Sequence, residues 1–172
     1  MPIPAYMKVT GVAQGVISEG ALSEDSVANL FQEGHDEEFM VQAFEHRIEI
    51  PRDAQSGQPS GNRVHLPITI TKIFDKSSPL LYQALVTGES LECEISWYRN
   101  SLEDSEQEHY FSHLIEGAVV VDIKTIMPNC QDPSQKHFTH MEEVSFSYST
   151  ITWTHEIAGT EGHDDWRISG GG

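Results

Sequence analysis

Basic residues are scarce in this 172-residue chain, which has 10 lysines and arginines against 27 aspartates and glutamates. The formal net charge of −17 repels phosphate groups, so we expect neither nucleic-acid binding nor insertion into an anionic membrane. Long apolar runs are also missing, because no stretch approaches the ~20 apolar residues of a transmembrane helix. Neither a basic nor an apolar segment follows Met1, so we expect no cleaved signal peptide and a chain that folds in the cytoplasm.

Cysteine is rare as well, with Cys93 and Cys130 the two in the chain. They lie in segments of different character, and nothing in their spacing points to a disulfide framework. We therefore expect both thiols to be reduced and buried, with a disulfide as the alternative.

Length and composition fit one folded domain. A chain of 172 residues is long enough to bury one hydrophobic core and too short for two of ordinary size. Apolar residues make up 38% and charged residues 22%, as in globular rather than disordered proteins. We expect a single domain over residues 1–172, with a flexible tail over about 167–172.

Alternation of apolar and polar residues, which is typical of β-strands, recurs along most of the chain. Strands are predicted over residues 5–9, 39–50, 64–74, 91–98, 109–115, 118–126 and 142–154. In the segment 39–50 the apolar side chains share one face: Met40, Phe44, Ile48 and Ile50. The charged side chains face the opposite way, toward water: Glu45, Arg47 and Glu49. A shift in the alternation after Tyr148 predicts a bulge in the last strand.

One segment has helical instead of strand periodicity. Ser78 is followed by a proline, a typical helix start, and Leu81 and Leu85 fall on one face. Gly88 is a typical residue just past a helix end. We predict one short helix between Asp75 and Gly88, packed against a sheet.

The remaining segments are polar and rich in turn-forming residues. Residues 53–62 and 127–135 are predicted to be exposed loops, and residues 158–172 a polar tail. Short strands at regular spacing with one helix favour a mainly β fold, either a β-sandwich or a closed β-barrel.

The chain has no conventional catalytic or metal-binding motif. The nearest histidine pairs are His137 with His140 and His109 with His113; on a strand these spacings place the rings on opposite faces or ~13 Å apart. No serine has the setting of a hydrolase nucleophile, and no glycine-rich segment carries the lysine of a phosphate-binding loop. A pairing of Cys130 with a distant histidine, or an acid pair brought together by the tertiary fold, remains open. We predict no catalytic residue, no cofactor and no metal site, with a monomeric β-barrel binding module or small hydrolase as the alternative.

Several blocks of sequence, in order along almost the whole chain, are similar to one known family. They are PIPAYMKVTGVAQG at residues 2–15, QSGQPSGNRVH at 55–65, PLLY at 79–82 with Ala84 and Leu85, Met127-Pro128 with Cys130 and Asp132-Pro133, and Gly159-Thr160 with Gly162 and Asp164-Asp165-Trp166. Together these blocks closely resemble the haemolysin co-regulated protein (Hcp) family. The resemblance implies a compact two-sheet β-barrel with one short flanking α-helix, in agreement with the strand pattern.

The resemblance also implies a function. Hcp proteins close into hexameric rings, which stack into the inner tube of the bacterial type VI secretion system. A contractile sheath expels the tube with a VgrG protein at its tip, and small effector proteins travel inside the ring. The chain would then be a structural subunit, not an enzyme, whose partners are itself, VgrG, the sheath and effectors. It would be secreted without a cleaved signal peptide.

Such a ring requires two different patches of one subunit to meet, and exposed sheet edges would supply them. The polar loop would reach a neighbouring ring through Gln55, Ser56, Gly57, Gln58, Pro59, Ser60, Gly61 and Arg63. A solvent-exposed loop without a partner is the alternative. By strand alternation, Glu45, Arg47 and Glu49 would face the lumen.

Overall fold

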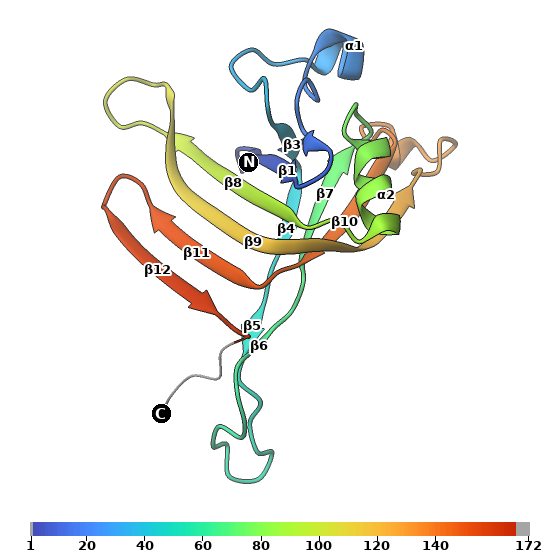
Figure 1. The fold of residues 1–172 in the computed structure, drawn as a ribbon. Coiled ribbons are helices and arrows are strands. Elements are labelled where there is room, and N and C mark those ends of the chain that lie inside the picture. The colour runs from blue at the N-terminus through green and yellow to red at the C-terminus, as the bar shows by residue number, and fades with distance from the viewer. Residues whose placement is uncertain (1, 168–172) are drawn as a thin grey trace.

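The computed structural model describes residues 2–167, and β-strands make up most of the regular structure (Figure 1). The strands are β1 (Ala5–Gly11), β2 (Gly15–Val16), β3 (Phe39–Val41), β4 (Ala43–Glu45), β5 (Ile48–Glu49), β6 (Val64–His65), β7 (Ile68–Ile73), β8 (Leu91–Asn100), β9 (Gln107–Ile126), β10 (Met141–Ser147), β11 (Thr150–His155) and β12 (Thr160–Asp165). The helices are α1 (Glu24–Val27) and α2 (Ser78–Thr87), with 3-10 turns η1 (Ala28–Leu30) and η2 (Pro133–Gln135). The predicted mainly β fold is confirmed, and α1 is a single helical turn that the sequence pattern did not indicate. Within the described residues, no helix has both the length and the apolar character needed to cross a membrane.

The strands form two sheets that share the long strand β9. In the first sheet, β9 pairs up to Ala118 with β8 and β11. In the second sheet, β9 pairs from Val119 onward with β10, which is followed by β7 and β4. Gly117 lies at this junction with φ +58, where an added Cβ would approach Ser149 Oγ to 2.7 Å, so glycine is required there. Figure 1 shows β9 curving along both sheets, and the predicted two-sheet arrangement is confirmed.

The barrel is open. The strand order runs β2-β1-β8-β9-β10-β7-β4 and does not return to its start within the described residues. The segment 39–45 partly bridges the gap, because β3 pairs with β1 and β4 pairs with β7. At Gln42, between these strands, the backbone N–H donates to Thr71 O at 2.8 Å. The closed barrel expected as one alternative is therefore wrong for this structure, whereas the two-sheet architecture is right.

Inward-pointing side chains of both sheets form a continuous buried core. Its large apolar members are 2% exposed or less: Met7, Val9, Phe39, Ile68, Ile70, Leu91, Ile95, Ile115, Phe146 and Ile151. The predicted helix is confirmed as α2, which packs Leu81 and Ala84 against this core. Pro79 lies in the first turn of α2, where backbone N–H groups have no acceptor within the helix, so the missing N–H of proline costs no hydrogen bond. Gly88 ends the helix at φ +65.

A buried charged cluster fixes α2 to the second sheet. Lys72 Nζ lies 2.7 Å from Glu142 Oε1 and 3.1 Å from Asp75 Oδ1, and none of these side chains is more than 2% exposed. The ammonium also donates to Ser78 Oγ at 3.1 Å and to Ile73 O at 3.0 Å. Because these groups come from β7, β10 and the start of α2, the cluster joins three elements at one point.

The predicted strand over residues 39–50 is wrong as a single strand. The structure divides it into β3, β4 and β5, because the chain pairs in turn with β1, β7 and β6. Ile48 and Ile50, predicted to lie on a buried face, are 38% and 51% exposed. They have left the sheets for the β5–β6 hairpin, where no core covers them. The predicted strand 64–74 divides into β6 and β7 for the same reason.

The predicted break between residues 115 and 118 is also wrong, because β9 continues through Gly117. Conversely, the predicted strand 142–154 consists of β10 and β11. The shift in alternation after Tyr148 marks the passage from one sheet to the other, not a bulge. A register shift occurs earlier instead, between Ser145 and Phe146.

The predicted tail from residue 158 is wrong over its first half, because β12 pairs antiparallel with β11. Most of β12 is exposed, so its residues carry no apolar alternation that could have indicated a strand. The flexible tail expected over about 167–172 lies outside the described residues except for Arg167, which pairs with Asp165 at 2.8 Å.

Both cysteines are free in the structure. Cys93 is buried as expected, whereas Cys130 is exposed, so the prediction of two buried thiols is wrong for Cys130.

Candidate assembly arm and its anchor

Residues 46–66, here called the arm, project away from the two sheets (Figure 1). The arm begins with the β5–β6 pairing, in which Ile48 lies opposite His65 and Glu49 opposite Val64. Further out, Arg52 and Pro59 form an isolated bridge. Every residue from 47 to 62 is exposed. The predicted exposed loop over residues 53–62 is therefore confirmed, and it forms the outer end of a hairpin.

Backbone hydrogen bonds order the tip of the arm. The carboxylate of Asp53 accepts the backbone N–H groups of Gln55 at 2.9 Å and Ser56 at 2.7 Å. These bonds, that of Ser56 first, hold the pKa of the Asp53 carboxyl below its usual range. The N–H of Asp53 donates to Gln58 O at 2.9 Å, and Gly57 turns the chain at φ +69. The tip is a defined turn whose side chains remain exposed.

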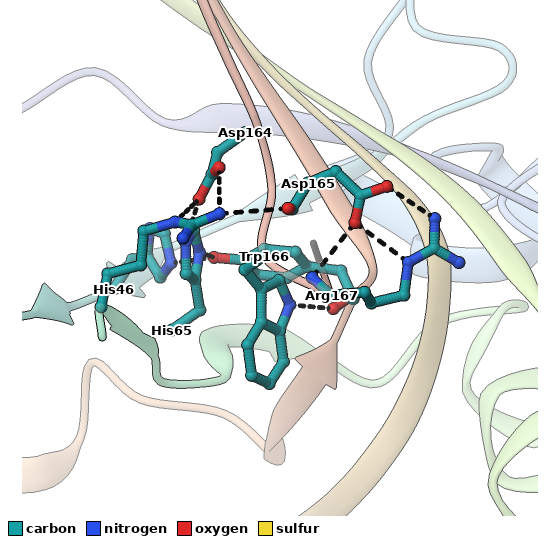
Figure 2. A network of polar contacts seen from close by, with 8 residues as sticks. His46, His65, Asp164, Asp165, Trp166 and Arg167 are labelled. Carbon is teal, nitrogen blue, oxygen red and sulfur yellow. Dashed lines mark hydrogen bonds and ion pairs between the residues drawn. The ribbon is translucent and has the colours of Figure 1, made fainter. Parts of the chain in front are cut away.

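Polar side chains tie the base of the arm to the end of the chain (Figure 2). The guanidinium of Arg63 forms two bonds with Asp164, from Nε to Oδ2 at 2.6 Å and from Nη2 to Oδ1 at 2.7 Å. Nη2 also donates to Asp165 O at 3.1 Å. The paired geometry lowers the pKa of the Asp164 carboxyl, chiefly through Arg63, and raises the pKa of Arg63. Asp164 therefore holds the Arg63 guanidinium in position and also favours its charged form.

A second chain of contacts runs from Asp164 through two histidines. His65 Nε2 lies 2.7 Å from Asp164 Oδ2, and His65 Nδ1 lies 2.6 Å from the Tyr148 hydroxyl. The same hydroxyl lies 2.7 Å from His46 Nε2. Trp166 stacks on the His65 ring at 5.6 Å between centroids and donates its Nε1–H to Tyr148 O at 2.6 Å. We call His46, Arg63, His65, Tyr148, Asp164 and Trp166 the anchor cluster.

Much of this cluster is shielded from water. The His65 side chain is 1% exposed and Tyr148 is 4% exposed, while Asp164 and Arg63 each keep 24% exposure. Burial, followed by the charge of Asp164, raises the pKa of Tyr148, so its phenol stays neutral and remains a hydrogen-bond donor. The base of the arm is thus held by groups that water reaches poorly.

The structure separates the residues predicted to form the interface into two sets. The residues from Gln55 to Gly61 lie at the tip, whereas Arg63 points back into the anchor cluster. Sequence reasoning missed His46, Tyr148 and the pairing of Arg63 with Asp164. A signal existed, because the motif block that ends in His65 and the block containing Asp164 and Trp166 were both recognised in the sequence. The fold brings these two blocks together across about a hundred positions of sequence, as the 101-residue separation of Arg63 and Asp164 records.

The residues expected to face a lumen are all exposed but do not share one sheet face. Glu45 lies on β4 opposite Thr69 at the edge of the second sheet, while Glu49 lies in the arm opposite Val64. Arg47 lies between them, at the point where the chain leaves the sheet. Strand alternation therefore predicted their exposure correctly, although the regular strand on which it relied is interrupted.

Among the described residues, a cluster of Ser112, His109 and Glu156 lacks the arrangement of a hydrolase site. Ser112 Oγ lies 2.8 Å from His109 Nε2 and donates to Glu156 Oε1 at 2.7 Å. In a catalytic triad the carboxylate orients the imidazole, whereas here Glu156 accepts from the hydroxyl itself. No group of three or more metal-ligating side chains lies together in residues 2–167.

A surface hollow of 870 Å³ lies beside α1 and is open to solvent. Glu19, Glu33 and His35 are among its lining residues, but the His35 ring is stacked on Tyr6 at 3.6 Å. The alternative of a binding module or small hydrolase needs an interior cleft. This hollow faces outward, so it is not such a cleft.

Comparisons with known proteins agree with the geometry. The family model described as type VI secretion system effector, Hcp, matches residues 6–155. The chain is 58% identical over 168 residues to the "Major exported protein" of Pseudomonas aeruginosa, covering 97% of each protein. It is similar to a crystal structure of an Hcp protein, with 44% identity and a TM-score of 0.91 over 96% of this chain and 99% of that one. A secreted Hcp protein from Pseudomonas aeruginosa is 51% identical with a TM-score of 0.81, again over 96% of this chain and 99% of that one.

Proposed function

Because the chain belongs to the Hcp family of type VI secretion proteins, we propose that it forms hexameric rings that stack into the inner tube of such a system. The family is one of exported tube proteins and not of enzymes. In this proposal the whole chain is one domain, resides in the cytoplasm before firing and leaves without a cleaved signal peptide. A VgrG protein lies at the tip of the tube, a contractile sheath expels it, and small effectors travel inside the rings.

The exposure and anchoring of the arm support its proposed role in contact between rings. It is exposed along residues 47–62, ordered at its tip by Asp53 and fixed at its base by Asp164. A projection that is already ordered loses little conformational entropy when it binds a neighbour. Residues 54–62 also carry no charge, so they avoid the repulsion expected between copies of a chain with a net charge of −17.

The two sets of arm residues then have different tasks. In our proposal the residues from Gln55 to Gly61 touch the next ring, and Arg63 positions the arm. Glu45, Arg47 and Glu49 face the lumen.

Ring closure requires two further surfaces of the subunit that meet each other. The edge of the first sheet is suitable as one of these two surfaces. Among the described residues, β12 pairs with β11 on one side only and offers its other edge to a neighbour. An unpaired edge of this kind readily adds a strand from another chain.

Deletion of residues 55–61 tests the assignment of the tip. The deletion leaves Arg63 and the rest of the anchor cluster in place, so rings should persist while stacked tubes and secretion are lost. A matched control is replacement of residues 102–105, in the exposed turn between β8 and β9, by glycine and serine, which should leave tubes unchanged. Negative-stain images of both variants, with a secretion assay, provide the comparison.

Two outcomes would contradict the proposal at different levels. If the 55–61 deletion still formed normal tubes, the proposed role of the tip in ring stacking would be wrong, whereas the proposal of ring formation would stand. A wild-type protein that stays monomeric at high concentration, without rings or tubes, would contradict the assembly function itself and favour a monomeric binding module.

A further inference from the structure

The anchor cluster contains two histidines that share one phenolic oxygen, and their hydrogen-bond directions can be assigned. Asp164 accepts hydrogen bonds only, so His65 Nε2 must carry the hydrogen that it shares with the carboxylate across 2.7 Å. In a neutral ring, His65 Nδ1 is then an acceptor and receives the Tyr148 hydroxyl hydrogen across 2.6 Å. The Tyr148 oxygen is left to accept from His46 Nε2–H across 2.7 Å. When both imidazoles are neutral, each of these three contacts therefore has one donor and one acceptor.

One added proton can be accommodated, but a second cannot. With a proton on Nδ1, His65 donates to both neighbours, and Tyr148 must turn its hydrogen toward His46 Nε2. That arrangement works only while His46 keeps its Nε2 unprotonated. If His46 is charged as well, both rings donate to the Tyr148 oxygen and the phenolic hydrogen loses its acceptor.

Charge acts in the same direction as the hydrogen bonds. Asp164 supplies the carboxylate of the anchor cluster, and Arg63 already occupies both of its oxygens. The nearby Asp165 carboxylate is engaged by Arg167 at 2.8 Å. Two charged histidines would therefore join an arginine around a single shared carboxylate.

Within residues 2–167, no ion pair or hydrogen bond joins His46 to a carboxylate, and its hydrogen-bond partner is Tyr148. From β9, the neutral His113 ring lies 6.5 Å from the His46 ring. From its own segment, the flanking Glu45 and Arg47 are exposed and opposite in charge. Burial, followed by the charge of His65, lowers the pKa of His46. The held arm thus excludes a proton that a detached arm, with its rings in water, would accept near pH ~6.5.

We propose that the anchor cluster is a proton-sensitive latch, which holds the arm in its projecting position at neutral pH and loosens it in mild acid. The latch regulates the position of the arm in the subunit, and it operates whether or not that subunit is part of a tube. By linkage, the held state is favoured above pH ~6.5 and loses that advantage as the pH falls below it.

Hydrogen exchange of the purified full chain tests the latch directly. Exchange is measured by mass spectrometry at about pH 7.5 and about pH 5.5 and corrected for the intrinsic pH dependence. Peptides from β8 serve as the internal reference. Amides at the base of the arm, including the Leu66 N–H that donates to Arg47 O at 3.0 Å, should exchange about tenfold faster in acid.

Variants distinguish the latch from general acid loosening. His46→Gln keeps a neutral N–H donor toward Tyr148 and cannot take a proton, so the acid response should fall below about twofold. His137→Gln, at an exposed site in the loop after β9, should keep the full response. If His46→Gln does not fold, Tyr148→Phe provides the second test, because it should loosen the arm base already at neutral pH. Equal protection of wild type at both pH values, or a full acid response in His46→Gln, would overturn the proposal.

The same measurement on the 55–61 deletion separates the latch from ring stacking. The deletion removes the proposed stacking contacts and retains the anchor cluster, so the acid response should persist. If the response vanishes with the tip, assembly and not the anchor cluster causes it, and the latch is refuted.

Discussion

Removal of the Lys72 ammonium should cause a large loss of stability, because it is the cation at the centre of a buried cluster. In Lys72→Met the aliphatic chain is retained, but Glu142 and Asp75, whose side chains are 1% and 2% exposed, lose that cation. Breaking a buried ion pair by removing one partner typically costs about 3–5 kcal/mol, since an uncompensated charge stays in the interior. Loss of the contacts with Ser78 Oγ and Ile73 O acts in the same direction.

Urea unfolding followed by tryptophan fluorescence provides the measurement, at one protein concentration because assembly shifts apparent stability. Lys136→Met, which removes the same charge from an exposed position, is the matched control and should change stability by less than about 0.5 kcal/mol. The double variant Lys72→Met/Glu142→Gln should recover about 1–2 kcal/mol, because one uncompensated carboxylate is removed. A loss below about 1 kcal/mol in Lys72→Met would refute the assignment of this cluster as the junction of α2 and the second sheet.

Three further predictions concern charge, acid and thiol reactivity. Assembly should increase between about 50 mM and about 500 mM salt, because screening reduces repulsion between chains of net charge −17; light scattering that falls steadily with salt would indicate attractive ion pairs instead. Burial, followed by the charge of His46, lowers the pKa of His113 to about 4, and its Nδ1 accepts from Trp97 Nε1 at 2.9 Å. The lowered pKa of His113 therefore stabilises the folded chain above pH ~6.5, and this contribution to the free energy of unfolding falls by roughly 3 kcal/mol toward pH ~4. Urea unfolding of His113→Gln should show a flatter dependence of stability on pH. An unchanged dependence would exclude His113 as its cause. Burial raises the pKa of the Cys93 thiol, so iodoacetamide should label the exposed Cys130 but not Cys93 in the native protein, as mass spectrometry can establish; labelling of Cys93 without denaturant would contradict the buried core.

The sequence pattern predicted elements correctly where periodicity and end signals agreed. The helix α2 has a proline in its first turn, Leu81 on its buried face and Gly88 at its end, so three independent signals gave the same answer. The fold class followed from alternation that is strong in buried strands such as β7 and β8. Local pattern contained enough information for these parts because burial and backbone preference act together in them.

Prediction failed where a strand changed its partner. Residues 39–50 keep an alternating pattern while pairing with β1, β7 and β6 in turn, and nothing local marks those changes. The strand β12 is mostly exposed and therefore has no apolar face to detect. Partner choice is a property of the tertiary fold, so a single sequence does not reveal it.

The candidate site was predictable in part. The loop composition indicated an exposed excursion, and the structure confirms that residues 47–62 are exposed. The anchor was missed because Arg63 and Asp164 lie 101 residues apart and each is unremarkable by itself. Recognition of family motif blocks marked both regions without explaining that they touch.

Native mass spectrometry of the purified full chain tests ring formation most directly. Our proposal predicts a dominant hexamer of the 19.3 kDa chain, with stacked multiples of that ring as concentration rises. A monomer at every concentration, or a series of open-ended oligomers without a preferred hexamer, would contradict it.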